Sequence, residues 1–145
     1  MKYIPTLLAD YFSKGYNIKL LNENTYSWDY PLVYPDGSKR FQYVYLGEVT
    51  EQEKEYLFIR SHIADFDDKL NAVQLLREAN LCNQGCVCLR TYTRTDGTQV
   101  EGVYVQSYFP VTLALQDKEA FISLVHEVAN RADAIEKKYL GMDQT

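Results

Sequence analysis

The sequence predicts an α+β domain in which an antiparallel meander sheet and helices follow the order α-β-β-β-α-β-β-α. Three observations indicate this fold. A helical pattern follows Asp67, a hairpin centres on Asp96-Gly97, and a long helical pattern closes the chain near Leu140. Strands joined by hairpins need no βαβ crossover, so the glycine-rich phosphate-binding turn of that unit is not expected.

Length and composition predict a single domain over residues 1–145, because 46% hydrophobic content suffices for a core without metal or disulfides. A net charge of −5 disfavours nucleic acid and anionic membranes as partners. Neither a membrane span nor a signal-peptide pattern is visible, and three cysteines fit a reducing compartment. We therefore expect a cytoplasmic bacterial protein whose partner is a protein or a small molecule.

The first predicted helix covers residues 4–14. Pro5 is tolerated in a first helical turn, and Gly15 can supply the left-handed residue that ends a helix. Apolar residues recur at spacings of three and four and form one stripe, namely Ile4, Leu7, Leu8, Tyr11 and Phe12.

Alternating side chains and turn signals predict three or more strands between Tyr16 and Ile63. Pro35-Asp36-Gly37 marks a hairpin loop, because aspartate and glycine favour tight turns. The segment Thr50–Glu55 is predicted as a second connection, and its acidic run should be solvated.

Two further helices are predicted. Asp67 or Asp68 can cap the first of them, which should end between Asn80 and Gly85. Its apolar residues are Leu70, Val73, Leu75, Leu76 and Ala79. The last helix should run from Asp117 to Leu140, before Gly141. Its inward residues are predicted to be Phe121, Leu124, Val125, Val128, Ala132, Ile135 and Tyr139.

The last hairpin allows its register to be derived. A two-residue loop would place Leu89 opposite Tyr104, whereas the three-residue loop Thr95-Asp96-Gly97 places Leu89 opposite Val103. The second register gathers aliphatic side chains on one face: Val87, Leu89, Val103 and Val105. The other face then carries Cys86, Cys88, Arg90, Tyr92, Tyr104, Gln106 and Tyr108. A slip by one residue would mix the two sets, so burial selects the second register.

The same division occurs upstream. Val44, Leu46, Leu57, Ile59 and Ile63 alternate with Phe41, Tyr43, Tyr45, Tyr56, Phe58, Arg60 and His62. The chain has 13 tyrosines, and tyrosine suits surfaces that are wet in one state and covered in another. We expect a protein-binding surface formed by Tyr43, Tyr45, Phe58, Tyr92, Tyr104 and Tyr108. Leu75 and Leu76 on the second helix form another candidate surface.

The order of elements, with Leu75-Leu76-Arg77-Glu78-Ala79-Asn80 and Arg94-Thr95-Asp96-Gly97-Thr98, supports a family comparison. The chain resembles YbjN-like proteins and, more distantly, type III secretion chaperones, in topology and pattern over most of its length. The resemblance implies a dimer-forming, protein-binding or regulatory module without established chemistry. It transfers no functional residue, and the tyrosine-rich strands depart from secretion chaperones.

No motif predicts catalysis, a cofactor or a metal. Cys82, Cys86 and Cys88 lack a paired knuckle and a fourth ligand, so packed thiols are favoured over zinc. His126 resembles the start of a zinc-protease helix, but Asn130 stands where the second histidine is needed. Three aspartates near position 67 lack the glycine and glutamate of a calcium loop, and helix capping explains them.

We therefore expect a non-enzymatic protein-binding or regulatory module that forms a homodimer. The alternative is a small-molecule binder or enzyme, because aromatic and polar side chains on the sheet face could wall a pocket. That pocket would be lined by Tyr43, Tyr45, Arg60, His62 and Tyr104. Histidine side chains can exchange protons near neutral pH, so His62 could act there as an acid or base.

Overall fold

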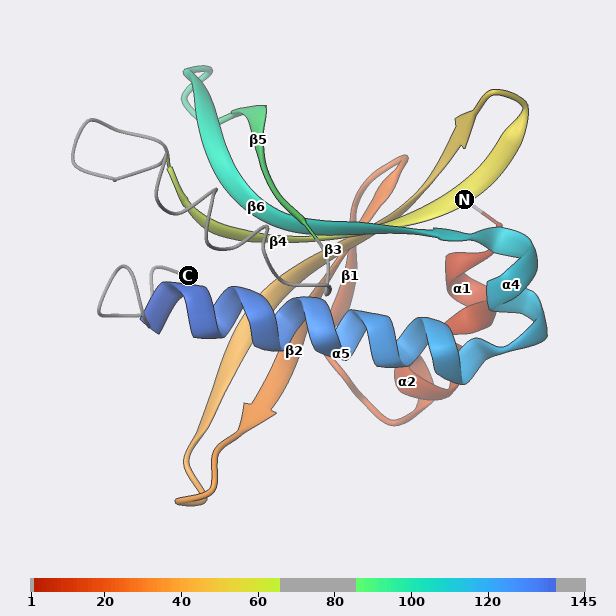
Figure 1. Ribbon diagram of the computed structural model, residues 1–145, viewed down its shortest axis with the longest axis horizontal. Coiled ribbons are helices and arrows are strands. Elements are labelled where there is room, and N and C mark those ends of the chain that lie inside the picture. Colours follow the sequence, from red (N-terminus) through yellow and green to blue (C-terminus); the bar gives the residue numbers. More distant parts are fainter. Residues whose placement is uncertain (1, 66–85, 138–145) are drawn as a thin grey trace.

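The computed structural model describes residues 2–65 and 86–137 and shows an α+β fold built on one six-stranded antiparallel sheet (Figure 1). The strands are β1 (Ile18–Asn22), β2 (Thr25–Val33), β3 (Lys39–Glu51), β4 (Lys54–Asp65), β5 (Cys86–Thr93) and β6 (Gln99–Pro110). The helices are α1 (Ile4–Leu7), α2 (Ala9–Ser13), α4 (Val111–Gln116) and α5 (Lys118–Ile135). The predicted α+β class and antiparallel pairing are confirmed.

The predicted order has three strands before residue 66, with three or more expected, and the structure has four, because β1 and β2 form a hairpin of their own. The predicted meander is wrong beyond β4. The spatial order is β1-β2-β3-β4-β6-β5, so the sheet is a meander only as far as β4. β6 is inserted between β4 and β5, and pairs antiparallel with both.

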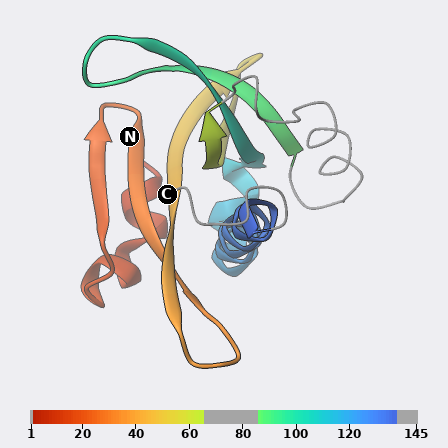
Figure 2. The same cartoon turned by 90° about the vertical axis from the view of Figure 1, so that its left-hand side faces the viewer.

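The sheet curves around α5, which packs on β3, β4 and β6 (Figure 2). One face of α5 is apolar because buried residues recur at helical spacing, including Phe121, Val125, Val128 and Ala132. They meet the aliphatic side of the sheet, where Val44, Leu46, Leu57, Ile59 and Ile63 are fully buried. The predicted core side of the sheet and the inward face of the last helix are therefore confirmed.

The N-terminal helix is interrupted. α1 ends at Leu7 and α2 begins at Ala9, so the predicted single helix over residues 4–14 is two short ones. Gly15 has φ +82°, as expected for a helix terminator. The Tyr16 N–H donates to the Tyr11 carbonyl (3.2 Å), and their rings meet edge to face at 5.4 Å. This closes α2 as a Schellman motif with its apolar contact.

Two hairpin loops share one construction. In the β5–β6 loop, the Arg94 N–H donates to the Thr98 carbonyl (2.8 Å), and Gly97 has φ +88°. Asp96 accepts from the Thr98 N–H at 2.9 Å. The β2–β3 loop repeats this arrangement with Asp36, Gly37 and Ser38 in the corresponding positions. The predicted three-residue loop and its register, Leu89 with Val103 and Val87 with Val105, are confirmed.

Leu89 is the exception on the aliphatic face. Its register is as predicted, but 41% of its surface is exposed. β5 forms the last strand of the sheet, and within the described residues α5 packs chiefly on β3, β4 and β6. Leu89 therefore lies beyond the part of the sheet that α5 covers, whereas Val87 is buried.

The predicted connection Thr50–Glu55 is much shorter in the structure. β3 and β4 pair as far as Glu51 and Lys54, so the loop consists of Gln52 and Glu53 alone. Both residues have positive φ, 49° and 67°, which is the type I′ geometry that suits a right-twisted hairpin. Neither residue is glycine or asparagine, so this turn is formed at a conformational cost.

Several predictions concern residues outside the described ranges. They include the helix predicted after Asp67 with Leu75 and Leu76, the Cys82 thiol, and the segment from Tyr139 to Gly141. The described end of α5 is Ile135, and its start is confirmed, since the Asp117 carboxylate accepts from the Ala120 N–H (3.1 Å). Among the described helices, none is both long and apolar enough to cross a bilayer.

Candidate functional site

The side of the sheet turned away from α5 carries most of the predicted site residues. Register places them on one surface, because residues two apart on a strand, and their cross-strand partners, share a side. We call this surface the aromatic face; it consists of Phe41, Tyr43, Tyr45, Tyr56, Phe58, Arg60, His62, Tyr92, Tyr104 and Tyr108. In Figure 1 the β3–β4 and β5–β6 hairpins both rise on this side, opposite α5.

The six predicted aromatic site residues differ in exposure. Tyr43 and Tyr108 are 41% and 45% exposed, and the neighbouring Phe41 is more exposed still. Tyr45 and Tyr92 are half-buried. Phe58 and Tyr104 are buried, at 5% and 8%. The face therefore combines buried rings with exposed ones.

Phe58 is buried by its own neighbours on the face. It pairs with Gly47 on β3, and a Cβ added to Gly47 would lie 2.2 Å from two carbons of the Phe58 ring. The Arg60 guanidinium stacks over the Phe58 ring, with its central carbon 3.9 Å from the ring centre. Arg60 Nε also donates to Gln106 Oε1 at 3.2 Å, which fixes the orientation of the guanidinium.

Tyr104 is buried in a second group of rings. His62 lies between Tyr104 and Tyr92, with ring centres 5.2 and 5.7 Å away, both edge to face. Gly102 leaves room for them, since a Cβ there would lie 2.8 Å from the Tyr104 ring. Burial raises the pKa of Tyr104 to about 12, with smaller contributions from neighbouring phenols and Asp65.

Asp65 joins this group to the β5–β6 hairpin. Its carboxylate accepts from the Tyr92 hydroxyl, from Arg94 Nη2 at 2.6 Å, and interacts with His62 Nε2 at 3.0 Å. Burial raises the pKa of Asp65, but the hydrogen bonds from Tyr92, Arg94 and His62 outweigh it and leave the pKa below its ordinary value. Asp65 therefore acts as an ionised tie between β4 and the neighbouring strands.

A polar cluster lies on the opposite side, beneath the C-terminal half of α5. Gln42 Nε2 donates to Ser61 Oγ and to Glu136 Oε1, each at 3.0 Å. Arg40 Nη2 contacts Asp133 Oδ1 at 2.9 Å and Glu136 Oε2 at 3.4 Å. Gln42, Ser61 and Glu136 have no exposed surface, so the cluster is part of the core.

Sequence reasoning missed this polar cluster. The signal was present, because Gln42 and Ser61 occupy inward positions of strands whose other inward residues are aliphatic. Asp133 likewise lies on the buried stripe of α5. Polar residues that break an apolar alternation in register with one another indicate a buried hydrogen-bonded group.

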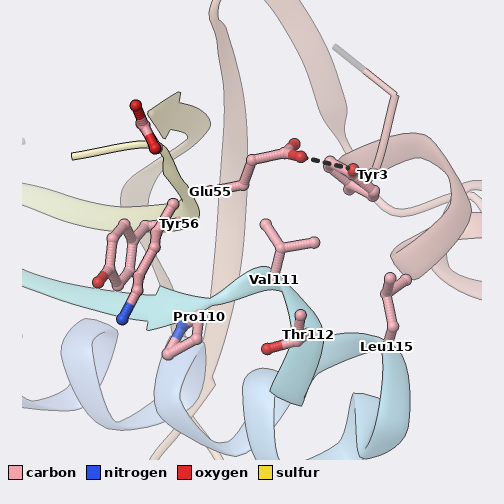
Figure 3. A pocket seen from close by; sticks show the side chains of 9 residues that line it. Tyr3, Glu55, Tyr56, Pro110, Val111, Thr112 and Leu115 are labelled. Carbon is pink, nitrogen blue, oxygen red and sulfur yellow. Dashed lines mark hydrogen bonds between the residues drawn. The ribbon is translucent and has the colours of Figure 1, made fainter. Parts of the chain in front are cut away.

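A pocket of about 520 Å³ opens at the end of the sheet where the β3–β4 hairpin meets α4 (Figure 3). Its walls include Tyr3, Tyr56, Pro110, Val111 and Leu115. Glu55 stands at the rim and accepts from the Tyr3 hydroxyl at 3.1 Å. Of the five residues predicted to wall a ligand site, Tyr43, Tyr45, Arg60, His62 and Tyr104, none lines this pocket.

The remaining candidates form no reactive group. His126 is exposed on α5, where Nδ1 lies 2.9 Å from the Tyr30 hydroxyl and Nε2 lies 2.7 Å from Asn130 Nδ2. Among residues 2–65 and 86–137, no group of three or more histidine, cysteine or acidic side chains could hold a metal ion. Cys88 is half-buried on β5 and forms no disulfide with a described residue.

The aromatic face combines large rings with a few ionisable groups. Exposed rings lie on the same face as buried ones, and the ionisable groups His62 and Asp65 interact with one another. Large aromatic side chains with a polar tip dominate the energetics of many protein interfaces. Comparison with known proteins adds no assignment, since neither a family model nor a curated protein sequence matches the chain.

Proposed function

We propose that the chain is a non-enzymatic protein-binding module that uses the aromatic face. The observation that carries this proposal is the group of large exposed rings on a sheet face that α5 leaves uncovered. Tyr43 and Tyr108 are 41% and 45% exposed, whereas Phe58 is buried and wedged against Gly47. Exposed tyrosine rings offer apolar contact area together with a polar tip, which suits a protein interface.

Photo-crosslinking tests the proposal. A benzophenone amino acid placed at Tyr43 or Tyr108 should capture a partner polypeptide in the source cell. The matched control is the same amino acid at Leu113, which is 50% exposed on α4. Capture that is equally strong from both sides of the molecule would reject the aromatic face as the binding surface.

A second copy of the chain is the partner that the family resemblance implies. Light scattering at high protein concentration measures this directly. We expect a dimer that Tyr43→Asp and Tyr108→Asp weaken, because a carboxylate buried without a partner is costly. A strict monomer would remove the homodimer and leave a different protein as the partner.

Small-molecule binding is the second candidate function, and the 520 Å³ pocket favours it. Its volume is within the range of ligand sites, and its walls combine apolar side chains with a few polar groups. Leu115→Trp should fill the pocket from the α4 side and leave Tyr43 and Tyr108, which do not line it, unchanged. If thermal-shift screening finds a ligand whose stabilisation is lost in Leu115→Trp, the pocket is a binding site.

A further inference from the structure

We infer that the aromatic face receives an acidic polypeptide segment in which carboxylates alternate with apolar side chains. The inference rests on the proposed protein-binding function and specifies the chemistry of the partner. It comes from the distribution of charge between the two sides of the sheet, which net charge alone conceals.

The described strand positions on the side of the aromatic face have a net positive charge, although the chain has a net charge of −5. By register, the described strand positions on this side include five basic residues: Lys19, Lys39, Lys54, Arg60 and Arg90. They include three acidic residues: Asp29, Glu51 and Asp65. Cations therefore outnumber carboxylates on this side, whereas carboxylates prevail over the chain as a whole.

Two of the three carboxylates are already engaged. Asp65 accepts from Tyr92 and Arg94, and Arg94 belongs to the loop beside β5 rather than to the five basic strand residues. Asp29 accepts a hydrogen bond from the Asn17 side-chain amide. Arg94 offsets the charge of Asp65, whereas Asn17 is neutral and leaves Asp29 charged, so the five basic residues face two carboxylates, Asp29 and Glu51. The field over the face is consequently positive and should attract an acidic partner.

Arg60 is the centre of this surface. It lies on the middle strand β4, stacked on Phe58 and bonded to Gln106, with its Nη2 3.5 Å from the Tyr108 hydroxyl. A guanidinium held by an aromatic ring pays little entropy when it binds a carboxylate. The exposed rings of Tyr43 and Tyr108 supply apolar contacts on the same face.

A polypeptide fits these features better than single-stranded nucleic acid. Stacked bases would suit the rings, but polynucleotides carry a charge on every residue and need a continuous cationic track. Here the five basic residues are separated along four strands, and the chain is acidic overall. A polypeptide segment carries its negative charge on a few side chains, and each carboxylate can pair with one basic residue of the face.

Fluorescence anisotropy with three labelled probes tests the inference on the full chain. The probes are a peptide of Glu, Asp and Phe, the same peptide with Lys in place of the acids, and a single-stranded polyuridine. The acidic peptide should bind, weaken as salt rises, and lose about tenfold in affinity in Arg60→Gln. The control Lys14→Gln removes a charge from the end of α2 and should leave binding unchanged.

The inference is overturned if the lysine peptide or polyuridine binds better than the acidic peptide, or if Arg60→Gln and Lys14→Gln behave alike. Circular dichroism of Arg60→Gln verifies that the fold is retained, and Arg60→Lys, which keeps the charge, should retain part of the affinity. Failure here is distinct from failure of the proposed function. Crosslinking at Tyr43 to a basic partner would keep the binding module and reject acidic recognition.

Discussion

The ring of Phe58 occupies the space that a side chain on Gly47 would need. Gly47 and Phe58 are directly paired across β3 and β4, and a Cβ on Gly47 would also lie 2.3 Å from the Asn24 carbonyl oxygen. Glycine covered by a cross-strand ring is a known device for fixing register in a sheet. The burial of Phe58 on the aromatic face therefore depends on the β3–β4 register that places it opposite Gly47.

Gly47→Ala should destabilise the protein by about 2–3 kcal/mol, because a methyl group forced against a ring and a backbone oxygen displaces both. Urea unfolding followed by circular dichroism measures the change in free energy. Gly37→Ala is the control, since it has open space but φ +85° and should cost only about 1 kcal/mol of backbone strain. Equal effects of the two substitutions would show that Phe58 does not constrain position 47.

The β3–β4 turn can be improved. Replacing Gln52-Glu53 by Asn-Gly should stabilise the protein by about 1–2 kcal/mol, because these residues adopt positive φ at lower cost. The melting temperature should rise accordingly. The reverse exchange in the β5–β6 loop, Gly97→Gln, should lower it, since Gly97 has φ +88°. A melting temperature unchanged by Asn-Gly would contradict the type I′ assignment.

The polar cluster beneath α5 depends on Arg40. Arg40→Met should destabilise the protein by about 3 kcal/mol, because it removes a cation that pairs with the buried carboxylates of Asp133 and Glu136, and the more exposed Lys137 lies 3.7 Å from Asp133. Chemical unfolding measures the loss. Lys39→Met changes the adjacent, exposed residue and should have little effect. Were both variants equally stable, the ion pairs of Arg40 would contribute no net stability.

Lowering the pH should weaken the interactions of the Asp65 carboxylate with Tyr92, Arg94 and His62. Its pKa in the folded protein lies below the ordinary 3.8, so folding favours the carboxylate form. This contribution is complete above pH of about 4 and is lost as pH falls through the lowered pKa. Asp65→Asn should therefore be less stable than the natural chain near pH 7, and the difference should shrink in acid. Unfolding free energies measured across that range check the prediction, and a constant difference would refute it.

The register of the last hairpin could be predicted because it depends on local chemistry. Asp96-Gly97 fixes the loop, and the choice between two registers is decided by whether Leu89 faces Val103 or Tyr104. The start of α5 was predictable for the same reason, since Asp117 caps it within one turn. Such features are decided by residues close together in the chain.

The insertion of β6 between β4 and β5 could not be read in this way. Every local signal is compatible with β5 beside β4, and the choice depends on which strand offers β4 the better partner. The observed pairing sets Leu57 against Phe109 and Phe58 against Tyr108. Cross-strand contacts between residues some fifty positions apart are set by packing of the whole sheet rather than by local patterns.

The alternation of residues in the sequence also could not predict which side chains of the aromatic face are buried. Alternation places Phe58 and Tyr43 on the same side, but only their neighbours distinguish them. Phe58 is covered through Gly47 and Arg60, whereas Tyr43 is opposite Asp29 and stays exposed. A sequence pattern assigns a side chain to a face, and the depth at which it lies follows from the sizes of its neighbours.

The late arrival of β6 in the chain has a consequence during synthesis. A ribosome delivers β1 to β4 well before Gln99–Pro110 emerges, so one edge of β4 lacks its final hydrogen-bonding partner for the interval between them. An unpaired strand edge can recruit strands of other nascent chains. Translation that pauses before residue 99 should therefore favour aggregation, whereas completion of the last hairpin closes that edge.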